Sequence, residues 1–154
     1  LIPAMKSIKG IHLLAGNIEH RLGVLSFYVD DLHYNLGVKL LNDRFGVQSR
    51  GGCSCAGTYG HFLLGVSMDF SKGITCKIDE GDLSEKPGWI RISIHPTMTD
   101  QEVDYIIEAV KQLAAHHKKW SIDYTYDTHT NEYTTQKSNK ETQHMVASWF
   151  DNIS

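Results

Sequence analysis

Two cysteines separated by one residue stand in a glycine-rich stretch, SRGGCSCAGTYGH, that runs from Ser49 to His61. Together with His61 and the distant Cys76, Cys53 and Cys55 could supply the thiolate and imidazole ligands of a zinc site. The spacing is against zinc, because structural sites usually place two or more residues between paired cysteines and the sequence has no second pair. A redox pair is disfavoured too, since thioredoxin-like chemistry uses two intervening residues and a Cys-x-Cys ring is strained. We therefore predict no metal site.

A single reactive thiol suits the local sequence better. Gly51 and Gly52 give the backbone freedom, and Arg50 supplies positive potential that favours a thiolate. A buried, inert cysteine in a turn is the alternative, since free cysteine is among the most commonly buried residues. We interpret His61 as a capping or packing residue of the turn rather than an acid or base, because the sequence indicates no partner for it.

The elements before this loop have distinct patterns. The stretches GIHLLAG and RLGVLSFYVDD are apolar or rich in β-branched and aromatic residues, which predicts two strands. HYNLGVKLLNDRFG places apolar residues at helical spacing, which predicts a helix that Gly46 ends. VQSR leaves room for a short strand, and CAGTYGHFLLG is expected to be a loop that leads into a helical turn.

The elements after the loop are punctuated by a polar segment. Residues 65–88 are charged and interrupted by glycine and proline, so we predict a surface connection with the character of an insertion. GWIRISIH alternates with a period of two, which places its three isoleucines on one face of a strand and Arg91 on the other. Thr99 and Glu102 form a capping box that begins a helix. Its apolar stripe consists of Val103, Ile106, Ile107, Val110, Leu113 and Ala114.

These elements predict an α+β fold, a two-layer sandwich in which helices cover one face of a small, mainly antiparallel sheet. Residues 1–120 are assigned to this domain. Residues 121–154 are polar and Thr-rich at first and end in an amphipathic segment, so we predict a linker and a terminal helix that docks through its apolar residues. These are Met145, Val146, Trp149 and Phe150.

Composition excludes several classes of function. The net charge is −3 and the 15 lysines and arginines are scattered, so no nucleic-acid partner is expected. No apolar run is long enough for a membrane span, and three cysteines do not make a disulfide framework, which favours a soluble protein of the cytoplasm. The chain begins with leucine, as an excerpt or processed chain would.

Two blocks of sequence resemble the C-terminal small domain of the class V aminotransferases, the pyridoxal-phosphate enzymes that include cysteine desulfurases and selenocysteine lyases. The first block is a helix end followed by a glycine-cysteine loop, and it matches at Phe45, Gly46, Val47, Arg50, Gly52, Cys55 and Ala56. The second is a strand followed by a capped helix, and it matches at Arg91, Ser93, Glu102, Val103 and Asp104. The resemblance covers roughly residues 11–118.

The resemblance implies roles for individual residues. Cys55 falls on the desulfurase nucleophile, which takes up the substrate's sulfur as a persulfide. Arg91 falls on the arginine that binds the substrate's α-carboxylate, and Arg50 on a second arginine at the mouth of the active site. Desulfurases often have histidine near the nucleophile, whereas this chain has Cys53 and Ser54, so either thiol could react and the reaction could be desulfuration or transamination.

The family's cofactor is held by a lysine that follows a histidine in a large upstream domain. The dipeptide His117-Lys118 is a false match, because Lys118 falls off the apolar stripe of its helix. The resemblance therefore implies a domain without cofactor-binding residues, inactive alone, whose terminal segment docks on this domain or on the large one. The full-length parent is expected to be a homodimer that acts on a small amino acid and passes sulfur to an acceptor protein. The alternative is a stand-alone binding module that uses the Cys-Gly loop for metal or protein contact.

Overall fold

The computed structural model describes residues 1–18, 20–53, 60, 63–65 and 67–135. Its centre is a four-stranded antiparallel sheet with the strand order β1-β2-β4-β3. The strands are β1 (Ile11–Leu13), β2 (Val24–Val29), β3 (Arg50–Gly52) and β4 (Trp89–Ser93). The short strand before the loop therefore includes both glycines and begins three residues later than VQSR predicts.

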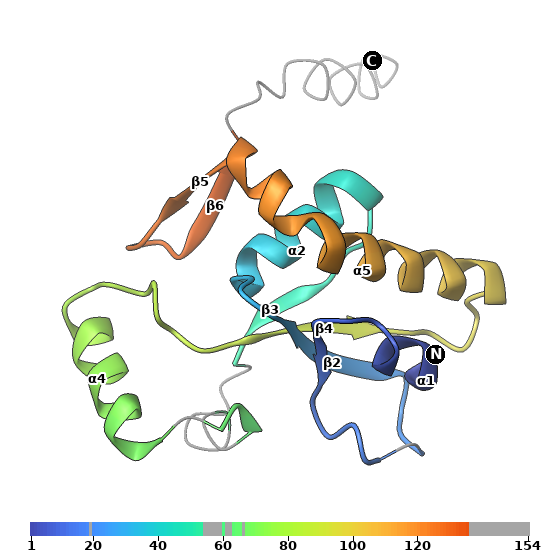
Figure 1. Cartoon of the computed structure of the whole chain (residues 1–154), viewed down its shortest axis with the longest axis horizontal. Helices are drawn as coiled ribbons and strands as arrows, with labels where there is room; N and C mark the ends of the chain where they lie inside the picture. Colours follow the sequence, from blue (N-terminus) through green and yellow to red (C-terminus); the bar gives the residue numbers. More distant parts are fainter. Residues whose placement is uncertain (19, 54–59, 61–62, 66, 136–154) are drawn as a thin grey trace, which may run out of the picture.

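Alternation along the two central strands decides which face of the sheet is covered. Leu25, Phe27, Ile90 and Ile92 are all at most 3% exposed, and they pack in one cluster with the helices. Because neighbouring residues of a strand point to opposite faces, Arg91 lies on the other face. Helices α2 (Tyr34–Phe45) and α5 (Asp100–Trp120) form the second layer (Figure 1), which confirms the predicted α+β two-layer fold.

The ends of these two helices follow the sequence signals. The N-cap of α2 is His33, and the helix ends at Gly46, which has a φ of 65° that glycine adopts without strain. Thr99 and Glu102 form the predicted capping box of α5. The middle of the predicted stripe of α5 is buried, with Val110 and Leu113 fully enclosed. A short helix α1 (Ile2–Lys6), which the sequence analysis did not predict, places Met5 in the same core.

The surface connection predicted over residues 65–88 contains a helix, α4 (Met68–Asp79). Ile74 is 2% exposed, so among the residues of this helix whose burial is described, Ile74 packs inward. An ion pair between Lys77 and Glu85 links its last turn to the following loop. The sequence analysis missed the helix because charges and Gly73 mask a short apolar spacing in it.

Residues 121–135, for which the polar composition predicts a linker or a tail held on the surface, have regular secondary structure. The chain forms a 3-10 turn, η1 (Ser121–Asp123), and a β-hairpin of β5 (Tyr124–Asp127) and β6 (Glu132–Thr135). Tyr124 and Tyr133 are half-buried and pack on the core, which supplies the apolar contacts that the polar composition concealed. The predicted terminal helix, with Trp149 and Phe150, lies outside the described residues.

The longest helix, α5, is amphipathic and carries charges along its length. Within the described ranges, no helix combines the length and apolar character of a membrane span.

Candidate active site

Arg50 and Arg91 are direct partners across the antiparallel strands β3 and β4. Opposed residues of this kind project to the same face of the sheet, with Cβ atoms about 5 Å apart. That face is opposite the helices, because Ile90 and Ile92 on either side of Arg91 point into the core. The structure thus brings together the two arginines that the sequence analysis assigned to substrate binding.

Among the described residues, no carboxylate balances the charges of the two guanidinium groups. Arg91 is half-buried and Arg50 exposed, and within the described part of the chain neither forms an ion pair with a carboxylate. By contrast, Arg44 on α2 is paired with Asp123 at 3.1 Å and lies over the Trp120 ring. Like charges directly opposite each other are destabilising, so a bound anion would relieve the repulsion between the sheet arginines. A carboxylate fits the planar donor fork of arginine.

The same face continues toward β1 with an aromatic pair. His12 and Tyr28 are register partners, and their rings stack with centroids 4.6 Å apart. His12 Nε2 lies 2.7 Å from Asp30 Oδ1, so the carboxylate fixes the orientation of the imidazole. The sequence analysis did not select these residues. The signal was the alternation of β2, which places Tyr28 on the same face as Ser26, and Ser26 is the register partner of Arg91 on β2.

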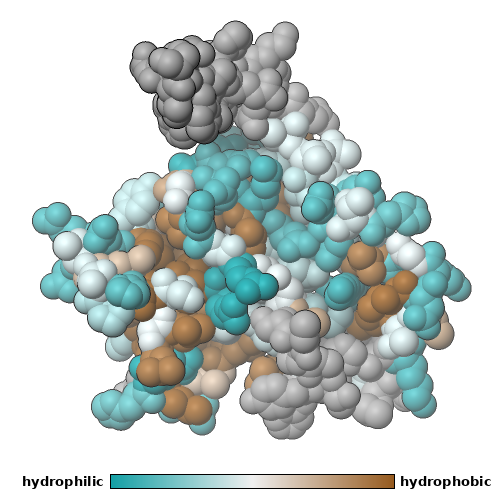
Figure 2. Space-filling view, turned by 180° about the vertical axis from the view of Figure 1, so that it is seen from behind, coloured by the Kyte–Doolittle hydropathy of each residue, from teal (hydrophilic) through white to brown (hydrophobic). Residues whose placement is uncertain are grey.

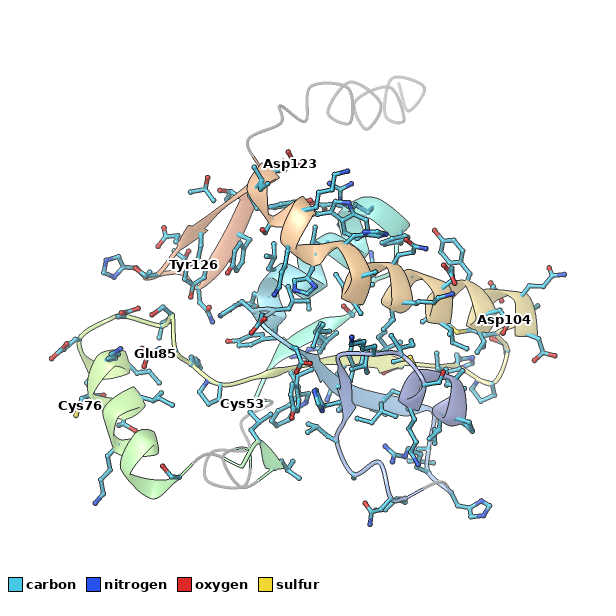
Figure 3. All side chains as sticks on the ribbon, viewed as in Figure 1. Cys53, Cys76, Glu85, Asp104, Asp123 and Tyr126 are labelled. Carbon is cyan, nitrogen blue, oxygen red and sulfur yellow. The ribbon has the colours of Figure 1, made fainter. Side chains whose placement is uncertain are left out.

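The thiols are separated along the fold. Cys53 follows β3, is free and half-buried, while Cys76 is exposed on α4. Figure 3 shows Cys76 on α4, away from Cys53 at the end of β3. Cys55 and His61 lie outside the described residues, so their predicted roles stay predictions. Among the residues that are described, no cluster of three metal-ligating side chains occurs.

Tyr34, at the start of α2, lies under the strand that leads to Cys53. A Cβ atom added at Gly88 would come within 2.5 Å of the Tyr34 ring, and one at Gly51 within 2.9 Å, so the ring packs directly on both backbones. The Tyr34 hydroxyl accepts a 2.7 Å hydrogen bond from Asn131 Nδ2. Burial raises the pKa of Tyr34, the hydrogen bond from Asn131 lowers it, and the charge of Cys53 raises it.

The sequence analysis missed Tyr34 and Asn131. They are 97 positions apart, and no local pattern joins them.

The dipeptide His117-Lys118 does not fit a site for pyridoxal phosphate. Lys118 Nζ forms an ion pair with Asp31 at 2.7 Å. His117 is buried in the helix layer, with Nδ1 at 3.2 Å from the carbonyl oxygens of Leu113 and Ala114. Both residues belong to α5, which covers the sheet face opposite the arginines, so this lysine cannot serve that face.

Comparison with protein families supports the resemblance drawn from the sequence. A family model described as aminotransferase class-V matches residues 1–106. The matched range contains the whole sheet and both arginines, ends within α5, and leaves out the β5–β6 hairpin. A comparison with curated proteins gave no match.

Proposed function

Because the chain belongs to the class V aminotransferase family, we propose that it supplies the substrate-carboxylate site of a pyridoxal-phosphate enzyme that acts on a small amino acid. Enzymes of this family depend on pyridoxal phosphate in general. The observation that carries the proposal is the opposition of Arg50 and Arg91 on one face of the sheet, without an acidic partner among the described residues.

The arginines have different tasks in this proposal. Arg91 is half-buried on a central strand, so its guanidinium is held in place and donates two parallel hydrogen bonds to the α-carboxylate. Arg50 is exposed on the edge strand and adds positive potential at the entrance, which attracts the anionic end of the substrate. Binding of the carboxylate orients the rest of the amino acid relative to the reacting groups.

The cofactor, when bound, supplies the electron sink that stabilises a carbanion at the substrate. Its lysine and its phosphate-binding residues are proposed to belong to a large domain of the same protein, since the His117-Lys118 dipeptide does not fit that task. The contribution of the present residues is to bind and orient the substrate.

The reaction depends on the thiols of the loop. In desulfuration, a thiolate of Cys55 forms a sulfur–sulfur bond with the substrate, and the substrate's carbon–sulfur bond breaks. The electron pair stays with the carbon, which takes up a proton to give alanine, and the persulfide passes its sulfur to an acceptor protein. Cys53, two residues earlier, is the second thiol that could react.

The test uses the full-length enzyme with cysteine and other small amino acids as substrates. Arg91→Ala should lower kcat/KM by about 10- to 100-fold for every amino acid, because hydrogen bonds to a charged group are lost. Arg44→Ala is the matched control, since this arginine is paired with Asp123 in the helix layer, and it should leave kcat/KM unchanged. An Arg91→Ala enzyme with unaltered kinetics would contradict the carboxylate site.

The second arm of the experiment separates the two reactions. Cys55→Ala should abolish sulfur release from cysteine, and Cys53→Ala should only weaken it, because Cys55 occupies the nucleophile position of the family motif. Measured sulfide and alanine report on this step. If neither the wild type nor Cys55→Ala releases sulfide or alanine from cysteine while Arg91→Ala is impaired with other amino acids, the enzyme is a transaminase and the loop only lines its site.

A further inference from the structure

The β5–β6 hairpin lies outside the range that matches the family, yet its turn contacts two segments next to the active-site strand. Within the turn, Asp127 Oδ1 accepts hydrogen bonds from the backbone N–H groups of His129 and Thr130. Toward the segment before β4, the Leu83 N–H donates to the Thr128 carbonyl at 2.9 Å. The turn is therefore ordered and tied to the chain that enters β4.

On its other side the turn presents Asn131, which is 8% exposed and hydrogen-bonded at both ends of its side-chain amide. Its Nδ2 donates to the Tyr34 hydroxyl, and its Oδ1 accepts from the Tyr126 hydroxyl at 2.8 Å. Its carbonyl accepts from Asn35 Nδ2. A buried amide with both ends satisfied makes a directional contact that is costly to break, because each lost partner leaves a polar group unpaired.

Tyr34 connects Asn131 to the active-site strand β3. Its ring packs on Gly51 in β3 and on Gly88 just before β4. The ring thus covers the end of the β3–β4 ladder from which the chain continues to Cys53. A side chain that is held at its hydroxyl and packed on β3 and on the residue before β4 fixes the position of these two segments relative to α2.

We propose that Asn131 is a positioning residue, which acts through the Tyr34 hydroxyl to fix β3 and so sets the placement of Arg50 and Cys53. The hairpin is then a clamp on the active-site strand, built from a part of the chain that the family match does not include. The functional meaning of the clamp rests on the proposed function, whereas the mechanical link from Asn131 to Cys53 does not. Figure 3 labels Tyr126 on the hairpin and Cys53 at the end of β3, the two ends between which this link runs.

Two variants break the hydrogen bond between Asn131 and Tyr34, and the variant at Asn131 also removes the acceptor of the Tyr126 hydroxyl. Tyr34→Phe keeps the ring on the two glycines and removes only the hydroxyl. Asn131→Gly removes the amide but keeps the turn, because the φ of 58° at this position suits glycine. Tyr124→Phe is the matched control, since it removes a tyrosine hydroxyl of the same hairpin that bonds Asp43 on α2 and does not contact β3.

The measurement is the rate at which iodoacetamide alkylates Cys53 in the full-length protein, followed by peptide mass spectrometry. Cys76, which is exposed on α4, serves as the internal reference. We expect Tyr34→Phe and Asn131→Gly each to raise the Cys53 rate about fivefold, the factor that corresponds to one net hydrogen bond. The Cys76 rate should stay constant, and Tyr124→Phe should leave both rates within about twofold.

The double variant Tyr34→Phe/Asn131→Gly decides whether the two residues act as one unit. The proposal requires it to react no faster than Asn131→Gly alone, because Tyr34→Phe removes no bond that Asn131→Gly leaves in place. Additive rates would overturn the proposal, as would an unchanged Cys53 rate in Tyr34→Phe or a Tyr124→Phe protein that reacts as fast as Asn131→Gly. Alkylation needs neither substrate nor cofactor, so these outcomes are independent of whether the proposed function holds.

Discussion

His33 stands where helix α2 begins and the hairpin packs against it. Its Nδ1 accepts a hydrogen bond from the Asn35 backbone N–H, so the proton of the neutral ring is on Nε2. The ring contacts three tyrosine rings, and its buried Nε2 has no hydrogen-bond acceptor. The tyrosines are Tyr34, Tyr126 and Tyr133, with centroids 4.5 to 5.4 Å away. Burial lowers the pKa of His33, because desolvation disfavours the charged imidazolium.

We therefore predict that acid weakens the fold through His33. In the unfolded chain the histidine pKa is about 6.5, so between this value and the lower folded pKa the unfolded chain binds more protons. The contribution of His33 to the free energy of unfolding should be fully present above about pH 6.5. It should be lost as the pH drops through the folded pKa, and the loss should be about 1 kcal/mol if the N-cap is lost.

Urea unfolding of the wild type and of His33→Asn between pH 7.5 and 5 measures this effect. Asparagine caps a helix without titrating, so the variant should show a smaller pH dependence over this range. The two proteins are otherwise identical in sequence, so the contributions of all other groups cancel in the comparison. Equal pH dependence in the two proteins would show that His33 does not contribute.

The sequence predicted which arginines belong to the site but not how they are placed relative to each other or to their neighbours. Arg50 and Arg91 could be selected because each falls in a recognisable motif, and the alternation of GWIRISIH correctly turned Arg91 away from the core. Their direct opposition depends on the register between β3 and β4, which is set by tertiary packing rather than by either segment alone. Tyr34 and Asn131 could not be paired from sequence, because only the folded hairpin brings them together.

Among the elements, those with strong local signals were predicted and those with polar surfaces were not. The capping box correctly predicted the start of α5, and Gly46 correctly predicted the end of α2. The hairpin was missed because residues 121–135 were judged by polarity. Their Tyr-Thr alternation on both sides of a short polar turn is typical of a hairpin whose long side chains pack with their apolar parts.

The packing of α2 on the β3–β4 ladder leads to a prediction about glycine. Gly88→Ala should lower the free energy of unfolding by about 1–3 kcal/mol, because the new Cβ would lie 2.5 Å from the Tyr34 ring. Gly73→Ala is the control, since within the described part of the chain no atom outside its own helix backbone lies within 4 Å of the added Cβ, and alanine favours a helix by about 1 kcal/mol. Chemical denaturation should give opposite signs for the two, and a harmless Gly88→Ala would contradict the close packing of Tyr34.

At the scale of the whole molecule, the two faces of the sheet differ in what they present. One face is covered by α2 and α5, and the other carries Arg50 and Arg91. On this second face, the first residue of β2, Val24, is 40% exposed. Ile18 and Leu22, in the connection between β1 and β2, are 50% and 86% exposed. Figure 2 shows apolar side chains gathered at the lower left, on the side of this connection. Neighbouring exposed apolar residues of this kind indicate a surface that another domain covers.

We predict that Leu22 is buried against the large domain or the second subunit in the full-length enzyme. Leu22→Asp should then lower the free energy of unfolding of the full-length enzyme by at least about 1.5–3 kcal/mol, the contribution of one buried leucine side chain. The buried charge adds a desolvation cost. Ile122→Asp is the matched control, because Ile122 is 77% exposed in η1, next to the hairpin rather than beside the arginine face. Urea midpoints and size-exclusion profiles of the two variants should differ, with only Leu22→Asp destabilised or dissociated. If both behave like the wild type, the apolar residues between β1 and β2 face solvent in the full-length protein, and the covered surface must be sought elsewhere on the sheet.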